Sequence, residues 1–323
     1  MNGIRTALIC GVSGQDGSYL ARFLLLKGYS VWGTSRNAKT SSFSNLKFLG
    51  IDGQVKLLSM TPNDFRSVLA TVKKCMPDEV YFLSGQTSVG LSFDQPIETF
   101  ESIAIGTLNM LEAIRILDSR IKFYNAGSSE CFGDVGVASS NENTPFQPRS
   151  PYAVAKASAH WMVTNYREIY GLFSCNGILF NHESPIRSAK FVTKKIISSA
   201  CRISKGSEEK LELGAIDIVR DWGWAPEYVE VMWLMLQQSI PGDYVIATGE
   251  ANSLEEFVRC AFELLGLDWR EYVILNREIL RPTDLYWSQG NPAKAESQLG
   301  WRAKLNMKDV IRNMIAAELA YVA

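Results

Sequence analysis

The sequence has few of the residues from which metal centres and nucleophilic triads are built. Only two of its 323 residues are histidines, His160 and His182, so a histidine-rich zinc site and a Ser-His-Asp triad are both disfavoured. The six cysteines are scattered without a CxxC pair, which in a chain of this length indicates reduced thiols in a cytosolic protein. They are Cys10, Cys75, Cys131, Cys175, Cys201 and Cys260. We therefore expect no metal site and no disulfide framework.

Neither sign of charge prevails, and long apolar runs are missing. The chain carries 33 Lys+Arg against 34 Asp+Glu, a net charge of -1. This balance argues against duplex nucleic acid or an anionic membrane as a partner, but it allows a local basic pocket that binds a phosphate. No stretch approaches ~18 uncharged apolar residues, and residues 1–6 lack an apolar signal core. We expect a cytoplasmic protein that binds neither nucleic acid nor a membrane.

What the sequence does contain is an alternation of short apolar runs and helical patterns. The runs at 6–10, 30–33, 55–58, 79–83, 122–126 and 173–180 predict strands. The patterns at 19–27, 97–117 and 152–170 predict helices, as does a stretch that ends near Met76. This alternation predicts an α/β Rossmann fold with a doubly wound parallel sheet.

The alternation becomes irregular beyond residue 180, where helices are predicted at 191–204, 228–238, 253–265 and 307–321. We predict a nucleotide-binding Rossmann domain at 1–178. Residues 179–323 would form mainly a smaller, mainly helical substrate-binding lobe, from which the chain returns to the Rossmann domain. Ligands of such folds bind beyond the carboxyl ends of the parallel strands, so we expect the site there.

A glycine loop follows the first predicted strand directly. Gly11, Gly14 and Gly17 have GxxGxxG spacing and lead into a helix. Glycines let the backbone turn sharply and approach a pyrophosphate, which then sits at the helix N-terminus. The alternative is a tight turn without a ligand. The residues expected to hold a dinucleotide here are Gly11, Ser13, Gly14, Gln15, Asp16 and Gly17.

The end of the second predicted strand indicates which dinucleotide binds. An acidic residue there would accept the ribose hydroxyls of NAD, but residues 33–37 read GTSRN, without a carboxylate. Arg36 and the hydroxyls beside it suit the 2′-phosphate of NADP instead. The alternative interpretation of Arg36 is a solvated surface charge.

Tyr152 and Lys156 form a YxxxK pattern on a predicted helix, where a spacing of four places both side chains on one face. A nearby ammonium favours phenolate, so a tyrosine that ordinarily titrates near pH ~10 can act as a general base. Upstream, Ser128 follows the fifth strand, two residues before Glu130. A hydroxyl at this place can bind the oxygen that gains or loses a hydride.

Several stretches of the chain are similar to those of a known family. They are VSGQDGSYL (12–20), TPFQPRSPYAVAK (144–156), NYREIYG (165–171), NGILFNHESP (176–185), RDWG (220–223) and YVIATG (244–249). With these the chain resembles the extended short-chain dehydrogenase/reductase family and, within it, the GDP-mannose 4,6-dehydratases. The resemblance covers nearly the whole chain.

The resemblance implies roles for individual residues. Ser128 stands at the usual position of a catalytic threonine, Glu130 at that of a glutamate typical of the dehydratases, and Tyr152 and Lys156 at those of the redox pair. Further cofactor contacts are implied for Leu83, Ser84, Gln86, His182 and Arg187. Contacts to the nucleotide sugar are implied for Ser88, Asn181, Lys195, Arg220 and Arg281.

The reaction implied is the NADP-dependent conversion of GDP-mannose, or a close GDP-sugar, to a 4-keto-6-deoxy sugar nucleotide. A homodimer or homotetramer is implied too, with residues 36–45 reaching a neighbouring subunit's cofactor. Three alternatives remain open: a GDP-heptose 4,6-dehydratase, a sugar-nucleotide reductase or epimerase that does not need Glu130, and a non-catalytic NADP-binding regulator.

Four positions depart from the family's pattern. Cys10 replaces a threonine or similar residue, Ser59 an aspartate expected near the adenine ring, Phe82 an asparagine, and Glu98 an aromatic residue. These departures concern contacts to the adenine and cofactor affinity more than the chemistry. Structural roles also remain possible for His182 as an interior histidine and for Arg220 as a partner of Asp221.

Overall fold

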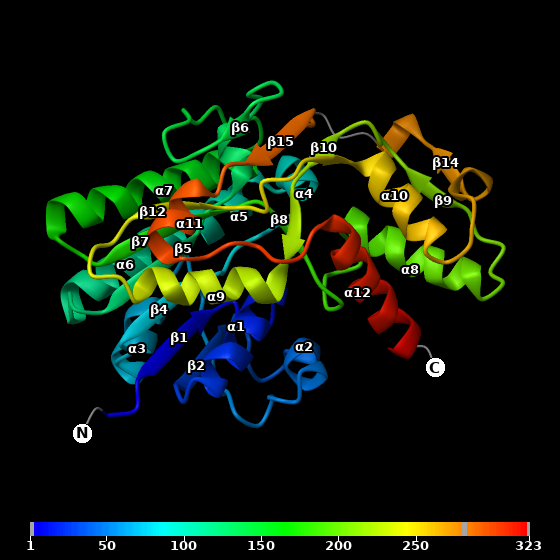
Figure 1. The fold of residues 1–323 in the computed structure, drawn as a ribbon. Coiled ribbons are helices and arrows are strands. Elements are labelled where there is room, and N and C mark those ends of the chain that lie inside the picture. Colours follow the sequence, from blue (N-terminus) through cyan, green and yellow to red (C-terminus); the bar gives the residue numbers. More distant parts are fainter. Residues whose placement is uncertain (1–2, 280–282, 322–323) are drawn as a thin grey trace.

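A single large parallel sheet organises the chain. The computed structural model describes residues 3–279 and 283–321. Seven parallel strands lie in the order β12-β7-β5-β4-β1-β2-β3 (Figure 1). Their bounds are β1 Thr6–Cys10, β2 Ser30–Ser35, β3 Lys56–Ser59, β4 Glu79–Phe82, β5 Lys122–Ala126, β7 Ser174–Leu179 and β12 Asp243–Ile246. The predicted doubly wound Rossmann sheet is confirmed, although its seventh strand, β12, was not expected from the sequence.

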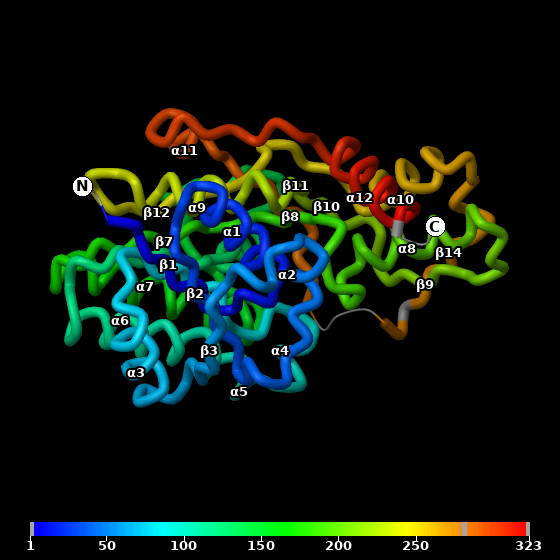
Figure 2. Tube along the Cα trace, turned by 90° about the horizontal axis from the view of Figure 1, so that it is seen from below, coloured from blue at the N-terminus to red at the C-terminus, as the bar shows by residue number. Residues whose placement is uncertain are grey.

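Helices cover both faces of this sheet, as Figures 1 and 2 show. On one face α1 (Gln15–Leu26) packs against α9 (Ala225–Leu236), and their apolar side chains share a core with β1 and β5. On the other face α3 (Phe65–Cys75), α6 (Gly106–Leu117) and α7 (Pro151–Tyr170) surround a second core. The order of the strands places β1 and β4 side by side at the centre, so the glycine loop and the turn after β4 meet at one edge.

The helix predicted over 97–117 is divided. It consists of α5 (Pro96–Phe100), one π-helical turn (Glu101–Ile105) and α6. Its apolar pattern runs through all three pieces, which is why periodicity predicts one helix. A π turn inserts one extra residue into the hydrogen-bond ladder without ending the helix, so the prediction was wrong in the regularity of the helix but not in its extent.

A smaller lobe is built on α8 (Val192–Ser204), α10 (Leu254–Glu263) and α12 (Met307–Tyr321), which pack around an apolar core of their own. It lies beside the large sheet at the right of Figure 1. Short strands complete it and join it to the sheet: β6 Ser139–Ser140, β8 Asn181–Glu183, β9 Leu211–Leu213, β10 Val219–Arg220, β11 Trp222–Trp224, β13 Asn252–Ser253, β14 Val273–Leu275 and β15 Trp287–Gly290. The remaining helices are α2 Ser44–Phe48, α4 Val89–Asp94 and α11 Ala293–Leu299.

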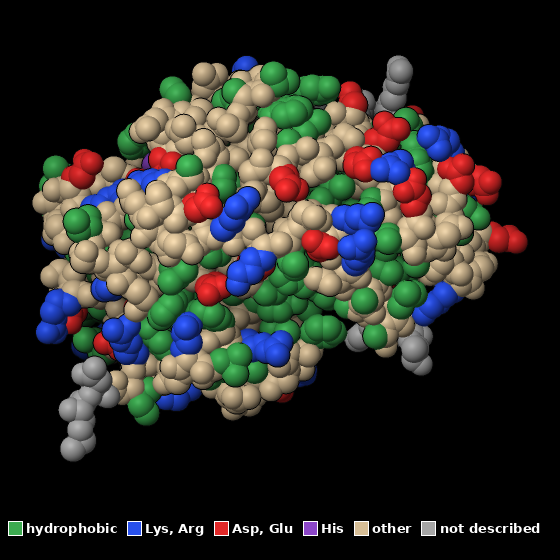
Figure 3. All heavy atoms as spheres, viewed as in Figure 1, with side chains coloured by type: hydrophobic (Ala, Val, Ile, Leu, Met, Phe, Trp, Pro, Cys, Tyr) green, Lys and Arg blue, Asp and Glu red, His purple; other side chains and the backbone are tan. Residues whose placement is uncertain are grey.

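The structure shows where the charged side chains and the cysteines lie. On the face drawn in Figure 3, acidic and basic side chains are interspersed. None of the helices in 3–279 and 283–321 is long and apolar enough to cross a membrane, and these residues include no group of three or more His, Cys, Asp or Glu side chains placed to hold a metal ion. All six cysteines are buried and free.

Candidate active site

The glycine loop closes tightly between β1 and α1. Gly11 has φ +85°, and a Cβ on it would lie 2.9 Å from the Leu83 carbonyl oxygen. A Cβ on Gly17 would lie 2.3 Å from the Gly11 carbonyl oxygen. The helix begins after Gly14, which has no side chain with which to cap the first turn. The first-turn N–H groups therefore point at a place where a phosphate can bind closely, which is what a dinucleotide requires.

Two departures from the family pattern, Glu98 and Ser59, contact the segment that follows β2. Arg36, after β2, forms an ion pair with Glu98 of α5 at 2.9 Å, and their side chains are 80% and 50% exposed. Ser59, at the end of β3, accepts a hydrogen bond from the Ala38 N–H at 3.0 Å. Ser59 thus anchors the segment that follows Arg36. The third departure, Phe82, is a buried core residue beside Phe123.

The residues after β4 form a turn next to the glycine loop. The Leu83 N–H donates to the Cys10 carbonyl at 3.0 Å, which ties this turn to the start of the glycine loop. Ser84 follows it, and the Gln86 side chain donates to the Ser88 carbonyl at 2.7 Å. The Ser88 hydroxyl accepts from the Leu91 N–H and caps α4. The structure thus gives Gln86 and Ser88 a role in shaping the turn.

Ser128 and Tyr152 meet beyond the end of β5. Their side chains are hydrogen-bonded to each other, and both residues are buried. Ser128 also accepts from the Glu130 N–H at 3.3 Å, so it caps the short 3₁₀ turn Ser129–Phe132 on which Glu130 lies. Ser150 caps α7 by accepting from the Ala153 N–H, with Pro151 in its first turn. These caps fix Tyr152 and Glu130 around one hydroxyl.

Burial controls the proton affinity of the two helix residues. Burial raises the pKa of Tyr152, and the Ser128 hydroxyl opposes this rise. Burial lowers the pKa of Lys156 to about 8. The Lys156 ammonium donates to the Ala126 carbonyl at 2.7 Å and lies 5.8 Å from the centre of the Tyr152 ring. A cation is therefore held within reach of the phenol, as the YxxxK spacing predicts.

His182 lies behind the glycine loop on β8. Its Nε2 is 2.9 Å from the Asp16 carboxylate, and its Nδ1 is 2.7 Å from the Phe180 carbonyl. Burial alone would lower the pKa of His182, but Asp16 outweighs it and the pKa is raised. Likewise burial would raise the pKa of Asp16, but His182 outweighs it and leaves the pKa lowered.

Gln15 and Arg187 lie close to the pair formed by His182 and Asp16. The Gln15 side chain donates to Asp16 and to the His182 carbonyl, both at 3.1 Å. The Arg187 guanidinium lies 3.1 Å from the Glu183 carboxylate and 3.5 Å from the centre of the Phe191 ring. Arg187 is thereby held on the same strand-to-helix segment as His182.

The expected substrate residues lie on the lobe side. Asn181 is paired with Trp222 between β8 and β11. Arg220 is buried; it pairs with Asp284 at 2.8 Å rather than with Asp221, and it also donates to the Val219 carbonyl. Lys195 is exposed and donates to the Glu212 carbonyl at 2.6 Å. Arg281 lies outside the described residues.

Comparison with known proteins decides the family. The sequence pattern of the family described as GDP-mannose 4,6 dehydratase matches residues 8–314. GDP-mannose 4,6 dehydratase 2 of Arabidopsis thaliana is 45% identical over 325 residues, which cover 98% of this chain and 87% of that protein. The GDP-mannose 4,6-dehydratase of Sinorhizobium fredii (strain HH103) is 43% identical over 346 residues, which cover 98% and 97%. The chain belongs to the GDP-mannose 4,6-dehydratase family.

Solved structures share the fold of this member of the GDP-mannose 4,6-dehydratase family. A UDP-glucose 4-epimerase of Thermus thermophilus, solved with NAD, has a TM-score of 0.85 at 26% identity, with 97% of this chain and 98% of that chain covered. RMD from Pseudomonas aeruginosa, complexed with NADPH, has a TM-score of 0.80 at 20% identity, with 98% of each chain covered.

The sequence analysis missed two residues whose side chains contact candidate site residues of this protein. Tyr228 of α9 stacks on the His182 ring, with centroids 4.5 Å apart and an interplanar angle of 24°. A Cβ on Gly223 would lie 2.3 Å from the Tyr228 ring, so the glycine of RDWG makes room for it and was the available signal. Asp284, the partner of Arg220, had no such signal because 64 residues separate the two.

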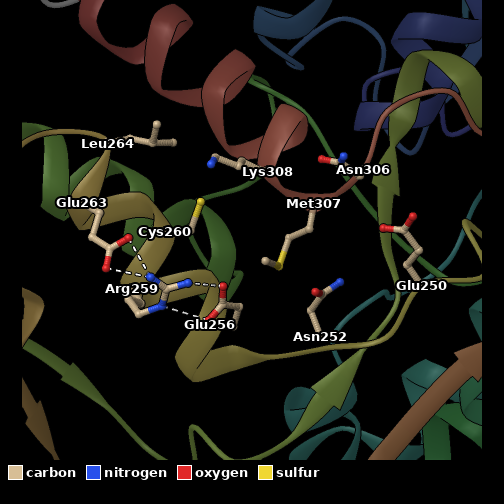
Figure 4. Close-up of a pocket in the computed structure, with 10 residues that line it drawn as sticks. All are labelled: Glu250, Asn252, Glu256, Arg259, Cys260, Glu263, Leu264, Asn306, Met307 and Lys308. Atoms are coloured by element: carbon tan, nitrogen blue, oxygen red, sulfur yellow. Dashed lines mark hydrogen bonds and ion pairs between the residues drawn. The ribbon is translucent and has the colours of Figure 1, made fainter.

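Two surface grooves lie away from these residues. One of about 460 Å³ runs between α10 and the start of α12, where Arg259 is held between Glu256 and Glu263 (Figure 4). A second, beside it, is lined by Gly300 and 302–305 together with Thr248, Glu250 and Asn306. Neither is lined by a residue that the sequence analysis assigned to cofactor, substrate or catalysis.

Proposed function

We propose that this chain is an NADP-dependent GDP-mannose 4,6-dehydratase, a hydro-lyase that converts GDP-mannose to GDP-4-keto-6-deoxy-mannose. One observation carries the proposal most directly. The Ser128 hydroxyl is hydrogen-bonded both to the Tyr152 phenol and to the backbone N–H of Glu130. A redox tyrosine and a second acid/base therefore lie around the same point. The family membership supports the substrate class.

A nicotinamide dinucleotide fits the residues present. The close approach of Gly17 to Gly11 and the uncapped first turn of α1 suit its diphosphate. Similar solved structures hold NAD or NADPH. Arg36, exposed at the end of β2 where an NAD enzyme has a carboxylate, supports NADP. When bound, the nicotinamide supplies the acceptor for the hydride of C4 and the source of the hydride returned to C6.

Tyr152 and Lys156 would carry the redox half of the reaction. Tyr152 takes the proton of the sugar 4-hydroxyl, and the Lys156 ammonium stabilises the phenolate that must form first. Ser128 donates a hydrogen bond to the oxygen of C4 as it becomes a carbonyl. The buried positions of these three groups exclude water from the carbonyl that they hold.

Glu130 would carry the elimination. Once C4 is a ketone, the proton on C5 is acidified, and Glu130 removes it. The same carboxyl then protonates the departing 6-hydroxyl, which leaves as water. A second acid/base beside Tyr152 is what separates a dehydratase from a reductase or epimerase that has the same serine, tyrosine and lysine.

The remaining assignments are part of this proposal. His182, Arg187, Leu83, Ser84 and Gln86 line the cofactor site, and Ser88, Asn181, Lys195, Arg220 and Arg281 the GDP-sugar site. We place the cofactor domain at 1–178 and the substrate lobe mainly at 179–323, and we propose a cytoplasmic homodimer or homotetramer.

Incubation with a panel of nucleotide sugars, followed by NMR, tests the function. GDP-mannose should give a 4-keto-6-deoxy sugar with no net consumption of cofactor. A reduced or epimerised sugar would support a reductase or epimerase instead. Turnover of a GDP-heptose alone would make that sugar the substrate. If no sugar gives a product, the non-catalytic NADP-binding regulator is favoured.

A further inference from the structure

The acceptors around His182 settle which protons the ring carries. Both ring nitrogens face oxygen atoms: the Phe180 carbonyl at 2.7 Å and the Asp16 carboxylate at 2.9 Å. A backbone carbonyl can only accept a hydrogen bond, so Nδ1 carries a proton. The contact with His182 keeps the pKa of Asp16 lowered, and an ionised carboxylate can also only accept, so the proton between them is assigned to Nε2. Two protons on one imidazole make it a cation.

The pair joins two elements at the proposed cofactor site. Asp16 lies in the first turn of α1, directly after the glycine loop. His182 lies on β8 and is 8% exposed. Gln15 of α1 and Ser184, the residue after β8, add a second bridge, because the Ser184 hydroxyl donates to the Gln15 side chain at 2.7 Å. The start of α1 is thereby fixed against β8.

A negative charge in this turn opposes the binding of a diphosphate. The N–H groups of the turn favour an anion, but the Asp16 carboxylate repels one. The imidazolium of His182 cancels that repulsion as long as it keeps its second proton. Both ring nitrogens are taken up by the protein, so the side chain acts on the cofactor through Asp16 and not by contact.

We propose that His182 is a positioning residue whose imidazolium holds and neutralises Asp16, and that loss of its second proton weakens cofactor binding as the pH rises. The proposal rests on the proposed cofactor function. It gives His182 a role other than the direct contact implied by family resemblance.

Other charged or titratable groups near the pair leave this direction intact. Arg187 opposes the second proton on His182, whereas Tyr228 covers the ring with the face of a buried phenol. Lys156 and Tyr124 also interact electrostatically with Asp16. The contact with Asp16 outweighs burial and Arg187, because the pKa of His182 remains raised.

NMR of the full chain labelled with ¹⁵N-histidine tests the ionisation directly, because the protein has only two histidines. His182 should show both nitrogens protonated near neutral pH. His160 is the internal control: burial lowers its pKa, and it should show one neutral tautomer. Spectra of His160→Gln assign the two signals. A neutral His182 at pH 7 would overturn the proposal whatever the cofactor does.

Cofactor titrations over the pH range supply the second test. NADP affinity of the wild type should fall as the pH rises from 6 to 9, by at most about tenfold per pH unit, since one proton is linked to binding. In Asp16→Asn the charge to be neutralised is gone, so affinity should fall less with pH than in the wild type, and the two curves should cross, with tighter binding of the variant at pH 9. A purely structural role predicts weaker binding of this variant at every pH.

The outcomes separate this proposal from the proposed function. Parallel curves for wild type and Asp16→Asn overturn the role of the pair while leaving the cofactor assignment in place. Failure of the wild type to bind NADP or NAD at any pH overturns both the cofactor assignment and the coupling proposed here. His182→Asn, which cannot become a cation, should bind NADP weakly and with a smaller fall in affinity with pH than the wild type; retention of the wild-type slope in this variant contradicts the proposal.

Discussion

Glu130 and Tyr152 contact the same serine, but substitutions of the two residues should block different steps of the reaction. Glu130→Gln keeps the size of the side chain and loses the base, so elimination should slow by ~10²–10⁴ while oxidation at C4 remains. Reduced cofactor should then accumulate in a single turnover. Tyr152→Phe should block the first oxidation and give no such signal.

The measurement is nicotinamide absorbance in a single turnover, with product NMR alongside. Glu208→Gln, a surface change far along the chain in the loop before β9, is the matched control and should behave as the wild type. Formation of the deoxy sugar by Glu130→Gln at the wild-type rate would remove Glu130 from the mechanism.

Lys156 should set the alkaline limit of the proposed reaction. Burial lowers its pKa to about 8, so its ammonium is present below that pH and is lost above it. The rate of the first oxidation should therefore fall by about tenfold per pH unit on the alkaline side. In Lys156→Arg the guanidinium stays charged, so the residual activity should lose this alkaline fall. A pH–rate profile of both proteins checks the prediction; an unchanged profile in Lys156→Arg would assign the limit to another group.

At the scale of single elements, the start of α1 requires a glycine at position 17. A Cβ on Gly17 would lie 2.3 Å from the Gly11 carbonyl oxygen, a backbone atom that cannot rotate away. Gly17→Ala should therefore destabilise the fold by about 1–3 kcal/mol and weaken cofactor binding. Denaturant unfolding and a cofactor titration measure the two effects.

Gly53→Ala is the control for this change, because nothing lies within 4 Å of the Cβ that it would add. It should alter the free energy of unfolding by no more than about 0.5 kcal/mol. Equal effects of the two substitutions would mean that α1 can move to accept a side chain.

Asp221 should make the junction between lobe and sheet sensitive to pH. It is fully buried and accepts hydrogen bonds from the N–H and hydroxyl of Thr248 and from the N–H of Gly249. Burial nevertheless raises its pKa to about 6. Because the folded state favours the protonated form, the stability that this group contributes is present at low pH and is lost as the pH rises through about 6.

The loss amounts to about 2–3 kcal/mol between pH 4 and pH 7. Asp221→Asn cannot ionise, so its deficit in free energy of unfolding relative to the wild type should shrink by that amount over this range. Urea unfolding of both proteins at several pH values measures the difference. A deficit that does not change with pH would mean that Asp221 titrates alike in the folded and unfolded states.

Local patterns predicted elements well where each one shows its own periodicity. The first six strands of the sheet and α12 lie where apolar runs and helical spacing place them. β12 was missed because its four residues follow a stretch in which alternation is lost. The π turn was missed because the apolar face continues through it.

The candidate site divides in the same way. Ser128, Glu130, Tyr152 and the glycine loop follow from short motifs, since each motif is one turn or one helix. The contact between Asp16 and His182 joins residues 166 apart, and such a pairing is decided by the packing of β8 on α1. No spacing within the sequence contains it.

At the scale of the whole molecule, cofactor binding should appear as resistance to heat. A ligand that binds only the folded state stabilises it by about 2.7 kcal/mol at 100 times its dissociation constant. NADP should therefore raise the melting temperature by several degrees and, at equal concentration, by more than NAD does, because Arg36 offers a partner to the 2′-phosphate. Thermal unfolding with each cofactor tests this preference; equal shifts would contradict it.

The position of β12 in the sheet has a consequence for how the protein folds during synthesis. The strand that pairs with β7 and the helix that covers α1 both belong to residues 225–246, after the first pieces of the lobe. During synthesis, β7 must wait with an open edge until those residues leave the ribosome, and open edges invite pairing with other chains. A fragment cut at residue 178 would keep that edge permanently. Separate expression of the two parts should therefore yield aggregate rather than two working halves.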